Sequence, residues 1–378
     1  MGSSKSKQSD PGGYLQETLT DHSDSINYIC LADDESILVT GSDDKTARLW
    51  ATKDATGSEC LGVLRGHTGY VTCVHVFDTC VVTGSSDGTV KRWDMTSCEC
   101  EFTYTGHASQ VMRVICTGQY VISSSKDTTA KVWLFDTDDL REGEEEKACI
   151  RTFKGHLKMV HPLIFIPSDD GKMEEEMVIT GSADYSAKLW SVDSGGCLVT
   201  YSDHRGPIMT MATDNSARIL FTGSADATVR TWHIRTGKLL KVFEGHTLQI
   251  MCLLVVNKLM YTADSAGVAK CWVWNLGDNT RDYKGHKHSV TYLRFNKGIL
   301  YTGCGDGVIR CFEAKSGTLV RSFITNDSPS VINCFAVCDN KLFAGSQDGK
   351  LRVWDITNIN EAVAPIPESL EAKPEAGQ

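Results

Sequence analysis

A short segment recurs eight times along the chain, and this feature restricts the fold more than any other. Typical copies are GSDDKTARLW (41–50) and GSSDGTVKRW (84–93). The aromatic residues that end the copies lie 40 to 43 residues apart, except for one interval of 57. A fixed period of this length indicates a repeat protein, in which each unit buries its core against its neighbours. The closing aromatic residues are Trp50, Trp93, Trp133, Trp190, Trp232, Trp272, Phe312 and Trp354.

A second signal runs in phase with the first. A histidine that follows Gly or Asp precedes seven of the repeats, and an alternating apolar stretch such as YVTCVHVF (70–77) comes after it. The repeat itself is followed by another short apolar run, such as CEFTY (100–104). Alternating runs that are separated by Gly- and Asp-bearing turns predict four short antiparallel strands per unit. We therefore expect an all-β chain of eight small sheets that stack on one another.

This pattern resembles the WD-repeat family of β-propellers, over about residues 14–357. The resemblance implies eight blades around an axis, each with strands a to d from the axis outward. It places loops d–a and turns b–c on a top face, and loops a–b and c–d on a bottom face. The segment LQETL (15–19) precedes the first histidine and has no repeat of its own. We expect it to be strand d of the last blade, so that the closed ring has no free sheet edge.

The resemblance also implies a buried network of Trp, a strand-b Ser or Thr, His and Asp in each blade. In blade 2 the members are Trp93, Thr83, His67 and Asp87. Such a network satisfies buried polar groups and fixes the register of the strands. Because the set recurs, we interpret it as structural and not as a catalytic triad, which would occur once. The residues assigned to networks are His22, Asp44, Trp50, His67, Asp87, Trp93, His107, Asp127, Trp133, His156, Asp184, Trp190, His204, Asp226 and Trp232.

Three blades depart from this pattern. Blade 6 has Ala266 where the aspartate belongs, and blade 7 has Phe312 in place of tryptophan. Blade 8 has Ser328 near the histidine position and Ala344 in place of the strand-b hydroxyl residue. We expect these three blades to lack part of the network and to open more easily than the others.

The composition disfavours several classes of protein. A net charge of −10 argues against nucleic acid as the main partner. No run approaches the roughly eighteen apolar residues of a membrane span, and no secretory signal is visible. We therefore expect a cytoplasmic protein whose 15 cysteines are reduced, most of them as small buried apolar residues. The cysteine spacing and the glycine-rich turns predict no metal, no cofactor and no enzyme.

The binding surface is expected on the top face, at two positions of strand a that flank its first inward-facing residue. Methionine occupies one of these positions in each of the successive blades 3 to 6. Its flexible thioether suits a surface that docks a peptide or helix, and the alternative is that it only fills the core. We expect a monomer that binds other proteins here. The candidate partner-binding residues are Tyr70, Met112, Met159, Met209 and Met251, with Thr72 and His161 at equivalent positions.

The long interval between repeats contains two acidic insertions. Residues 134–148 lie in the c–d loop of blade 3 and carry seven carboxylates and two basic residues. Residues 167–176 lie in the a–b loop of blade 4 and carry five carboxylates and one basic residue. The excess negative charge is therefore concentrated on one side of the bottom face. It predicts either a solvated pair of acidic loops or a patch that steers a basic partner.

The opening residues MGSSKSK carry a separate signal. They fit the pattern for N-myristoylation of Gly2, and they are similar to the first residues of Src-type tyrosine kinases. A single acyl chain binds membranes weakly, with K on the order of 10⁴ M⁻¹. We therefore expect reversible attachment to the cytoplasmic face of membranes. The predicted organisation is a flexible N-terminal segment (1–13), the propeller (14–357) and a disordered C-terminal tail (358–378).

The function predicted from these features is a non-catalytic scaffold for protein–protein interaction. The first alternative is a substrate receptor of a cullin-type ubiquitin ligase, which some WD-repeat proteins become through a Trp-Asp-x-Arg box. The nearest match is Trp232 to Arg235, in which His233 replaces the aspartate. The second alternative, a propeller hydrolase, is disfavoured because the polar residues are distributed evenly over the blades.

Overall fold

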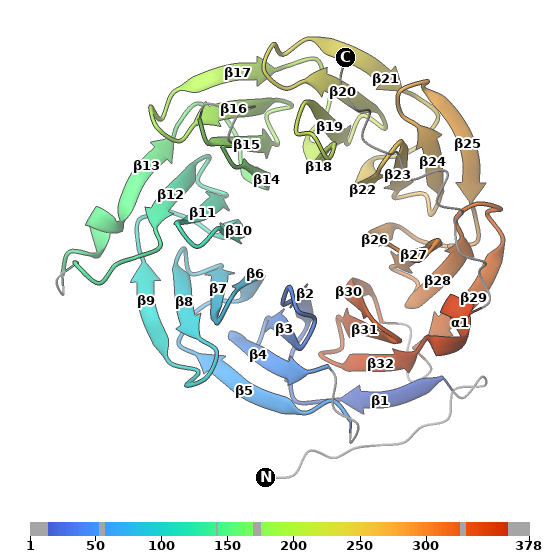
Figure 1. Cartoon of the computed structure of the whole chain (residues 1–378), viewed down its shortest axis with the longest axis horizontal. Coiled ribbons are helices and arrows are strands. Elements are labelled where there is room, and N and C mark those ends of the chain that lie inside the picture. The colour runs from blue at the N-terminus through green and yellow to red at the C-terminus, as the bar shows by residue number, and fades with distance from the viewer. Residues whose placement is uncertain (1–13, 53–56, 141–142, 169–174, 326–329, 362–378) are drawn as a thin grey trace, which may run out of the picture.

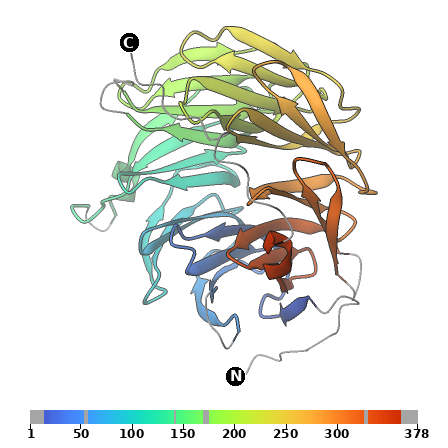
Figure 2. The ribbon, with the colours of Figure 1, turned by 45° about the vertical axis from the view of Figure 1, so that its right-hand side comes forward.

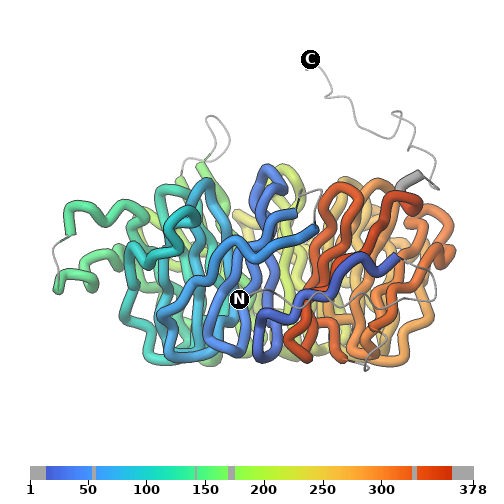
Figure 3. Tube along the Cα trace, turned by 90° about the horizontal axis from the view of Figure 1, so that it is seen from below, coloured from blue at the N-terminus to red at the C-terminus, as the bar shows by residue number. Residues whose placement is uncertain are grey.

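Eight four-stranded antiparallel sheets stand around a common axis in the computed structural model (Figure 1). The structure describes residues 14–52, 57–140, 143–168, 175–325 and 330–361. The sheets are tilted like the blades of a fan (Figure 2), and the ring is a flat disc when seen from the side (Figure 3). The predicted all-β propeller of eight blades is therefore confirmed.

The strands follow the order a to d from the axis outward in every blade. The a strands are β2 (Ile26–Leu31), β6 (Val71–Phe77), β10 (Val111–Cys116), β14 (Val160–Ile166), β18 (Ile208–Thr213), β22 (Ile250–Val256), β26 (Val290–Asn296) and β30 (Ile332–Cys338). The b strands are β3 (Ile37–Ser42), β7 (Cys80–Ser85), β11 (Tyr120–Ser125), β15 (Met177–Ser182), β19 (Ile219–Ser224), β23 (Leu259–Asp264), β27 (Ile299–Cys304) and β31 (Lys341–Ser346). The c strands are β4 (Thr46–Ala51), β8 (Val90–Asp94), β12 (Ala130–Leu134), β16 (Ala187–Ser191), β20 (Val229–His233), β24 (Ala269–Val273), β28 (Val308–Glu313) and β32 (Leu351–Asp355). The d strands are β5 (Cys60–Arg65), β9 (Cys100–Tyr104), β13 (Cys149–Phe153), β17 (Cys197–Tyr201), β21 (Leu239–Phe243), β25 (Asp278–Tyr283), β29 (Leu319–Ile324) and β1 (Leu15–Leu19).

The first strand of the chain completes the last blade, as predicted. β1 pairs antiparallel with β32, with Leu19 opposite Leu351. Leu19 is buried in a cluster with Leu351 and Val353, so the join is apolar as well as hydrogen-bonded. Without β1, the edge of β32 would be free to pair with other chains.

The C-terminal boundary predicted from the sequence is too early. Helix α1 (Thr357–Glu361) follows the last strand, and Ile359 is fully buried against blade 8. Residues 1–13 and 362–378 lie outside the described residues, so the predicted flexible segment and the remainder of the predicted tail stay predictions. No helix in the described part of the chain is long and apolar enough to cross a membrane.

Strand b explains why the repeat begins with a Gly-Ser pair. Neighbouring blades cover strand b on both faces, and in β7 every residue after Cys80 is buried. A Cβ on Gly84 would lie 2.7 Å from Cys73 Sγ and 2.7 Å from Val111 Cγ1 of the next blade. Glycine is therefore needed here because the blades approach each other so closely.

The conserved geometry of the repeats comes from the buried networks, as blade 2 illustrates. Trp93 Nε1 donates to Thr83 Oγ1 at 2.8 Å, and Thr83 Oγ1 lies 2.7 Å from His67 Nε2. His67 Nδ1 lies 2.9 Å from Asp87 Oδ2. A carboxylate can only accept, so Nδ1 carries the proton and Nε2 accepts from the hydroxyl. The assigned residues of blades 1, 3, 4 and 5 make the same contacts.

Blade 6 corrects the prediction that it lacks a carboxylate. Asp264, at the end of β23, lies 2.8 Å from His246 Nδ1 and is almost fully buried. The other blades have Ser or Cys at the position of Asp264. The carboxylate of blade 6 therefore comes from the residue two positions before Ala266. The side chain reaches the same imidazole because Asp264 lies at the top of the same turn.

Blades 7 and 8 lack part of the network, as predicted, and in both of them an arginine pairs with its partly buried aspartate. In blade 7 the guanidinium of Arg310 contacts both His286 Nδ1 and Asp306. In blade 8, Arg352 Nη2 donates to Asp348 at 2.7 Å. The predicted Ser328 position lies outside the described residues. Ala344 offers no hydroxyl group, and the buried Trp354 Nε1 has no hydrogen-bond partner among the described residues.

Candidate functional site

The top end of strand a is irregular in every blade, and this irregularity shapes the candidate site. In each blade the pairing of strands a and b skips the second residue of strand a. A bulge of this kind leaves a residue unpaired and redirects its side chain. The bulge residues in chain order are Asn27, Thr72, Met112, His161, Met209, Met251, Thr291 and Asn333.

The bulge residues divide the ring into two halves. In blades 8, 1, 2 and 7 the side chain donates to a strand-a carbonyl of the next blade, at 2.7 to 3.0 Å. Blades 3, 5 and 6 have methionine at this position, which cannot donate. The methionine series therefore replaces contacts between blades by apolar side chains, and it marks one half of the ring.

A hollow of about 330 Å³, here called the top-face pocket, is lined by residues of blades 1, 2, 3 and 4. It brings together four residues predicted from the sequence, namely Tyr70, Thr72, Met112 and His161. The sequence interpretation missed its other members, because they lie at different positions of their repeats. The lining residues are Asn27, Asp43, Tyr70, Thr72, Gln110, Met112, Arg113 and His161.

Exposed apolar side chains continue from the pocket across blade 4. Met159, one residue before β14, is 37% exposed. Leu157, two residues earlier, is also exposed, and so is Tyr185 in the turn between β15 and β16. We call Leu157, Met159 and Tyr185 the apolar ledge. Leu157 follows the histidine of its repeat, where the other blades have smaller or polar residues. That difference was the available sequence signal for the ledge.

Tyr185 has an unusual backbone conformation for an aromatic residue. Its φ is 75°, and the equivalent position in blade 2 is Gly88. The same turn position also has a positive φ at Lys45, Thr128 and Ala227, so this conformation belongs to the turn of the repeat and does not by itself mark a functional site. Lys158 Nζ lies 5.0 Å from the centre of the tyrosine ring and holds it in place.

Met209 and Met251 lie outside both features. Each is half-buried at its bulge, and neither lines the top-face pocket. The predicted arc of methionines therefore separates into two groups. Met112 and Met159 belong to the pocket and the ledge, whereas Met209 and Met251 are further along the ring.

The charges of the pocket are asymmetric. Asp43 accepts from the Asn27 amide at 2.7 Å, so its charge is already engaged. The guanidinium carbon of Arg113 lies 4.7 Å from the centre of the Tyr28 ring. Burial, together with the positive charge of Arg113, lowers the pKa of His161 to about 3. His161 is therefore neutral at pH 7, and its imidazole is hydrogen-bonded to the backbone of Met209.

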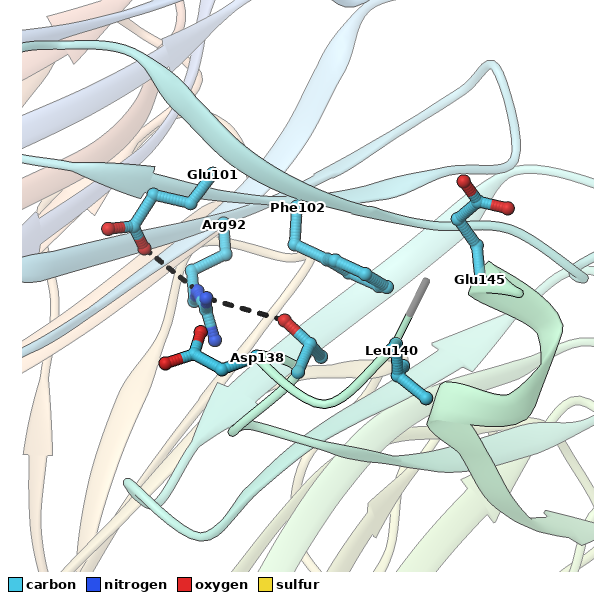
Figure 4. Close-up of a pocket in the computed structure, with 7 residues that line it drawn as sticks. Arg92, Glu101, Phe102, Asp138, Leu140 and Glu145 are labelled. Carbon is cyan, nitrogen blue, oxygen red and sulfur yellow. Dashed lines mark hydrogen bonds and ion pairs between the residues drawn. The ribbon is translucent and has the colours of Figure 1, made fainter. Parts of the chain in front are cut away.

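A second hollow, of about 420 Å³, lies between the insertion of blade 3 and strand β9 of blade 2 (Figure 4). Arg92 Nε donates to Glu101 at 2.8 Å, and its other nitrogens reach the Phe135 carbonyl and the Thr137 hydroxyl. The short 3-10 helix η1 (Glu145–Ala148) ends in the fully buried Ala148. The described part of insertion 134–148 is thus packed on blade 2 and is not simply a solvated loop. For insertion 167–176, residues 169–174 lie outside the described part.

The arginine of the segment that resembles the ubiquitin-ligase box, Trp232 to Arg235, contacts an acidic residue of blade 4. Arg235 Nη1 lies 3.7 Å from Glu175 Oε1, which belongs to the second acidic insertion. Ile234, between His233 and Arg235, is fully buried. The arginine therefore joins two loops of the bottom face.

Two groups of side chains could offer three ligand atoms to a metal ion, one in blade 7 and one at the bottom of blades 1 and 8. In the first group Arg310 contacts both His286 and Asp306, so a cation would meet an existing positive charge. Burial raises the pKa of Cys304 in this group and of Cys338 in the other to about 11. Metals bind the thiolate, which these cysteines do not form readily. We assign no metal to either group.

The family model described as WD domain, G-beta repeat, matches residues 13–51, 58–94, 98–133, 147–191, 195–233, 277–313 and 317–355. Strands β22 to β24 of blade 6 fall between the fifth and sixth of these segments. The structure therefore adds an eighth blade to the seven matched repeats.

Two natural relatives and one solved structure illustrate the range of similarity. Mitochondrial division protein 1 of Mycosarcoma maydis is 27% identical over 202 residues, which are 50% of this chain and 24% of that protein. Human WD repeat-containing protein 86, which the repeats of this chain resemble, is 36% identical over 211 residues, 56% of this chain and 55% of that protein. The crystal structure of the computationally designed Ika8 protein superposes with a TM-score of 0.75 at 26% identity, over 91% of this chain and 98% of that one. The chain thus spans about a quarter of the length of the first natural relative and about half of the length of the second.

Proposed function

The chain belongs to the WD-repeat family of β-propellers, and on this premise we propose that it is a non-catalytic scaffold that binds a protein partner at its top face. WD-repeat proteins typically act as scaffolds for protein interaction and are typically not catalytic. The proposal places the partner on the top-face pocket and the apolar ledge. It describes a monomeric protein of the cytoplasm.

The observation that carries the proposal is the exposure of large apolar side chains around the pocket. Tyr70 of blade 2 is 51% exposed, and Leu157 of blade 4 is 85% exposed. Large exposed side chains scattered singly are ordinary, but several beside one polar pocket are typical of an interaction surface. The polar residues of the blade networks support the absence of catalysis, because they repeat around the ring and are committed to each other.

Affinity purification with quantitative mass spectrometry tests the proposal. The test variant is Tyr70→Ala combined with Leu157→Gln. The control is Leu198→Gln combined with Leu240→Gln, which removes exposed leucines from the outer strands β17 and β21. We expect the main partners to be lost from the first variant and kept by the second. Partners that persist with both variants would contradict a top-face site, and abundant cullin-adaptor peptides would favour the ligase receptor instead.

We also propose that myristoylation of Gly2 attaches the scaffold weakly to membranes. Gly2 lies outside the described residues, so the motif MGSSKS supports this proposal alone. Protein made together with an N-myristoyltransferase should carry one acyl group and sediment with anionic liposomes, and Gly2→Ala should do neither. If the wild type gains no acyl mass, or if Gly2→Ala sediments equally well, the tether does not exist.

A further inference from the structure

We propose that Arg113 anchors a carboxylate of the docked partner, so that the top-face pocket selects peptides with an acidic residue. This inference rests on the proposed function and adds the chemistry of the partner. The repeat pattern assigned no role to Arg113. This residue occupies the third position of its strand, where the other blades have uncharged residues.

The first argument is that Arg113 has a charge without a counter-charge. Among the described residues, the salt bridges of arginine are formed by other arginines, and no carboxylate pairs with Arg113. Its guanidinium carbon lies 4.7 Å from the centre of the Tyr28 ring, and this contact positions the guanidinium without neutralising it. A half-buried cation is normally paired, because its removal from water is unfavourable. The pocket therefore has a place for an anion.

The second argument is that a neutral donor accompanies the arginine. The Gln110 side chain also lines the pocket, and it makes no hydrogen bond within the described residues. Other donors of the pocket are already used, since the His161 imidazole bonds to the Met209 backbone, Asn27 to Val71 and Asp43, and Thr72 to Val111. A carboxylate accepts several hydrogen bonds at once, and the guanidinium of Arg113 together with the Gln110 amide can supply them.

The third argument comes from the other arginine that lines a hollow. Arg92 is also partly buried beside an aromatic ring, Phe135, at 4.8 Å. Its guanidinium is fully used by Glu101, Phe135 and Thr137, which belong to the protein itself. The protein thus completes the environment of Arg92 and leaves that of Arg113 open.

The surroundings also restrict where the acidic residue stands in the partner. Asp43 lies on the blade 1 side of the pocket, and the apolar ledge lies on the blade 4 side. A carboxylate on Arg113 avoids the negative charge of Asp43 if the chain that carries it continues over blade 4. We therefore expect an acidic residue next to one or two large apolar residues that cover Leu157, Met159 and Tyr185.

A selection from a random twelve-residue peptide library on phage tests this inference. The immobilised proteins are the full chain, Arg113→Gln, and Arg294→Gln as a matched control. Arg294 is another arginine of a strand a, lies over Tyr292 at 5.2 Å and does not line the pocket. We expect Asp or Glu to be enriched beside apolar residues in peptides from the full chain and from Arg294→Gln, and this enrichment to disappear with Arg113→Gln. Thermal melting must first show that each variant is folded.

Calorimetry with one selected peptide gives the decisive number. Replacing its acidic residue by Gln should weaken binding to the full chain roughly tenfold or more, the effect of one charge-assisted hydrogen bond. The same replacement should change binding to Arg113→Gln by less than about twofold, because the coupling is then absent. A peptide whose acidic residue is equally important for both proteins would overturn the assignment of Arg113.

The remaining outcomes separate this inference from the proposed function. Selected peptides that are apolar without acidic enrichment, and that compete with the top-face variants, would overturn the anion site and keep the docking surface. No selected peptide on any of the three proteins would contradict both. A peptide that binds only when phosphoserine replaces its acidic residue would show that the pocket takes a phosphate, and it would overturn the carboxylate assignment.

Discussion

Blade 2 and blade 8 hold a partly buried aspartate in the same turn, but its hydrogen-bond donor differs between them. Asp87 of blade 2 accepts from the neutral imidazole of His67, at 2.9 Å. Asp348 of blade 8 accepts from the guanidinium of Arg352, whose side chain is only 2% exposed. The aspartate of blade 2 therefore accepts from a neutral donor, whereas the aspartate of blade 8 forms an ion pair with an arginine.

The arginine of blade 8 stands at a position that is basic in every repeat, two residues before the closing aromatic. In blade 2 this residue is Lys91, which reaches outward to Thr103 of strand d at 2.8 Å. In blade 8 no imidazole occupies the turn within the described residues, so Arg352 bends back to the aspartate. The basic residue at this position thus has two uses in blades 2 and 8.

Blade 7 is intermediate, because it has both the histidine and the inward arginine. Asp306 lies 3.9 Å from His286, compared with 2.9 Å for the pair in blade 2. Arg310 donates to His286 Nδ1, which must then be unprotonated. The proton is therefore on Nε2, whereas the histidines of blades 1 to 6 carry it on Nδ1. Departure from the repeat consensus changes the network here and does not simply weaken it.

The largest expected effect concerns the closure of blade 8. Deleting residues 1–19 removes β1 and exposes the edge of β32, so we expect loss of the cooperative melting transition and aggregation. Deleting residues 2–12 leaves β1 in place and should leave the melting temperature unchanged. Differential scanning calorimetry and size-exclusion chromatography measure both effects. Similar behaviour of the two truncations would mean that β1 is not needed for the ring.

The next effect contrasts the two aspartates directly. Asp348→Ala leaves a buried guanidinium unpaired and should lower the free energy of unfolding by roughly 3–5 kcal/mol. Asp87→Ala leaves a neutral imidazole without its acceptor, a loss of roughly 1–3 kcal/mol. Chemical denaturation of both variants gives the comparison. If Asp87→Ala is the more damaging change, the ion pair of blade 8 contributes less than its burial suggests.

Blade 6 should behave like blade 2, although its turn lacks the usual aspartate. Asp264→Ala removes the acceptor of His246 and should also lower the free energy of unfolding by roughly 1–3 kcal/mol. Ala266→Ser, in the same turn, should change it by less than about 0.5 kcal/mol. Equal effects of the two changes would show that the carboxylate of Asp264 is not part of the network.

Blade 7 should make the protein sensitive to mild acid. Burial and the nearby Arg310 lower the pKa of His286 to about 4. Between this value and an unfolded pKa of about 6.5, the unfolded chain takes up a proton that the folded chain does not, so stability falls as the pH falls. This group should account for a loss of about 2 kcal/mol between pH 7 and pH 5. His286→Gln should remove that part of the loss in denaturation curves at the two pH values, and Arg310→Gln should reduce it.

The smallest effect is the change of tautomer, which has no expected consequence for stability. Nitrogen-15 chemical shifts of histidine-labelled protein should show Nε2–H for His286 and Nδ1–H for His67. In Arg310→Gln, where the cationic donor is gone, His286 is expected to return to the Nδ1–H form. An Nδ1–H signal for His286 in the wild type would contradict the contact with Arg310.

The sequence by itself determined the period, the number of blades, the closing strand and most members of the networks. These features depend on contacts within one repeat, such as that between Thr83 and Trp93. The spacing of such residues along the chain can be read directly from the sequence. The sequence pattern also indicated Tyr70, Met112 and Met159 as exposed or half-exposed positions of the top face. It placed the two insertions in the loops where the structure has them.

Only the tertiary structure decided which side chains meet across blades. Arg113 reaches Tyr28 of blade 1 from blade 3, and insertion 134–148 packs on β9 of blade 2. Asp264 and Arg352 enter their networks from positions that the repeat alignment assigns to other roles. The physical reason is that a buried charge must be paired or hydrogen-bonded. The groups that lie close enough to pair with it are set by the closed ring of eight sheets and not by the distance along the chain.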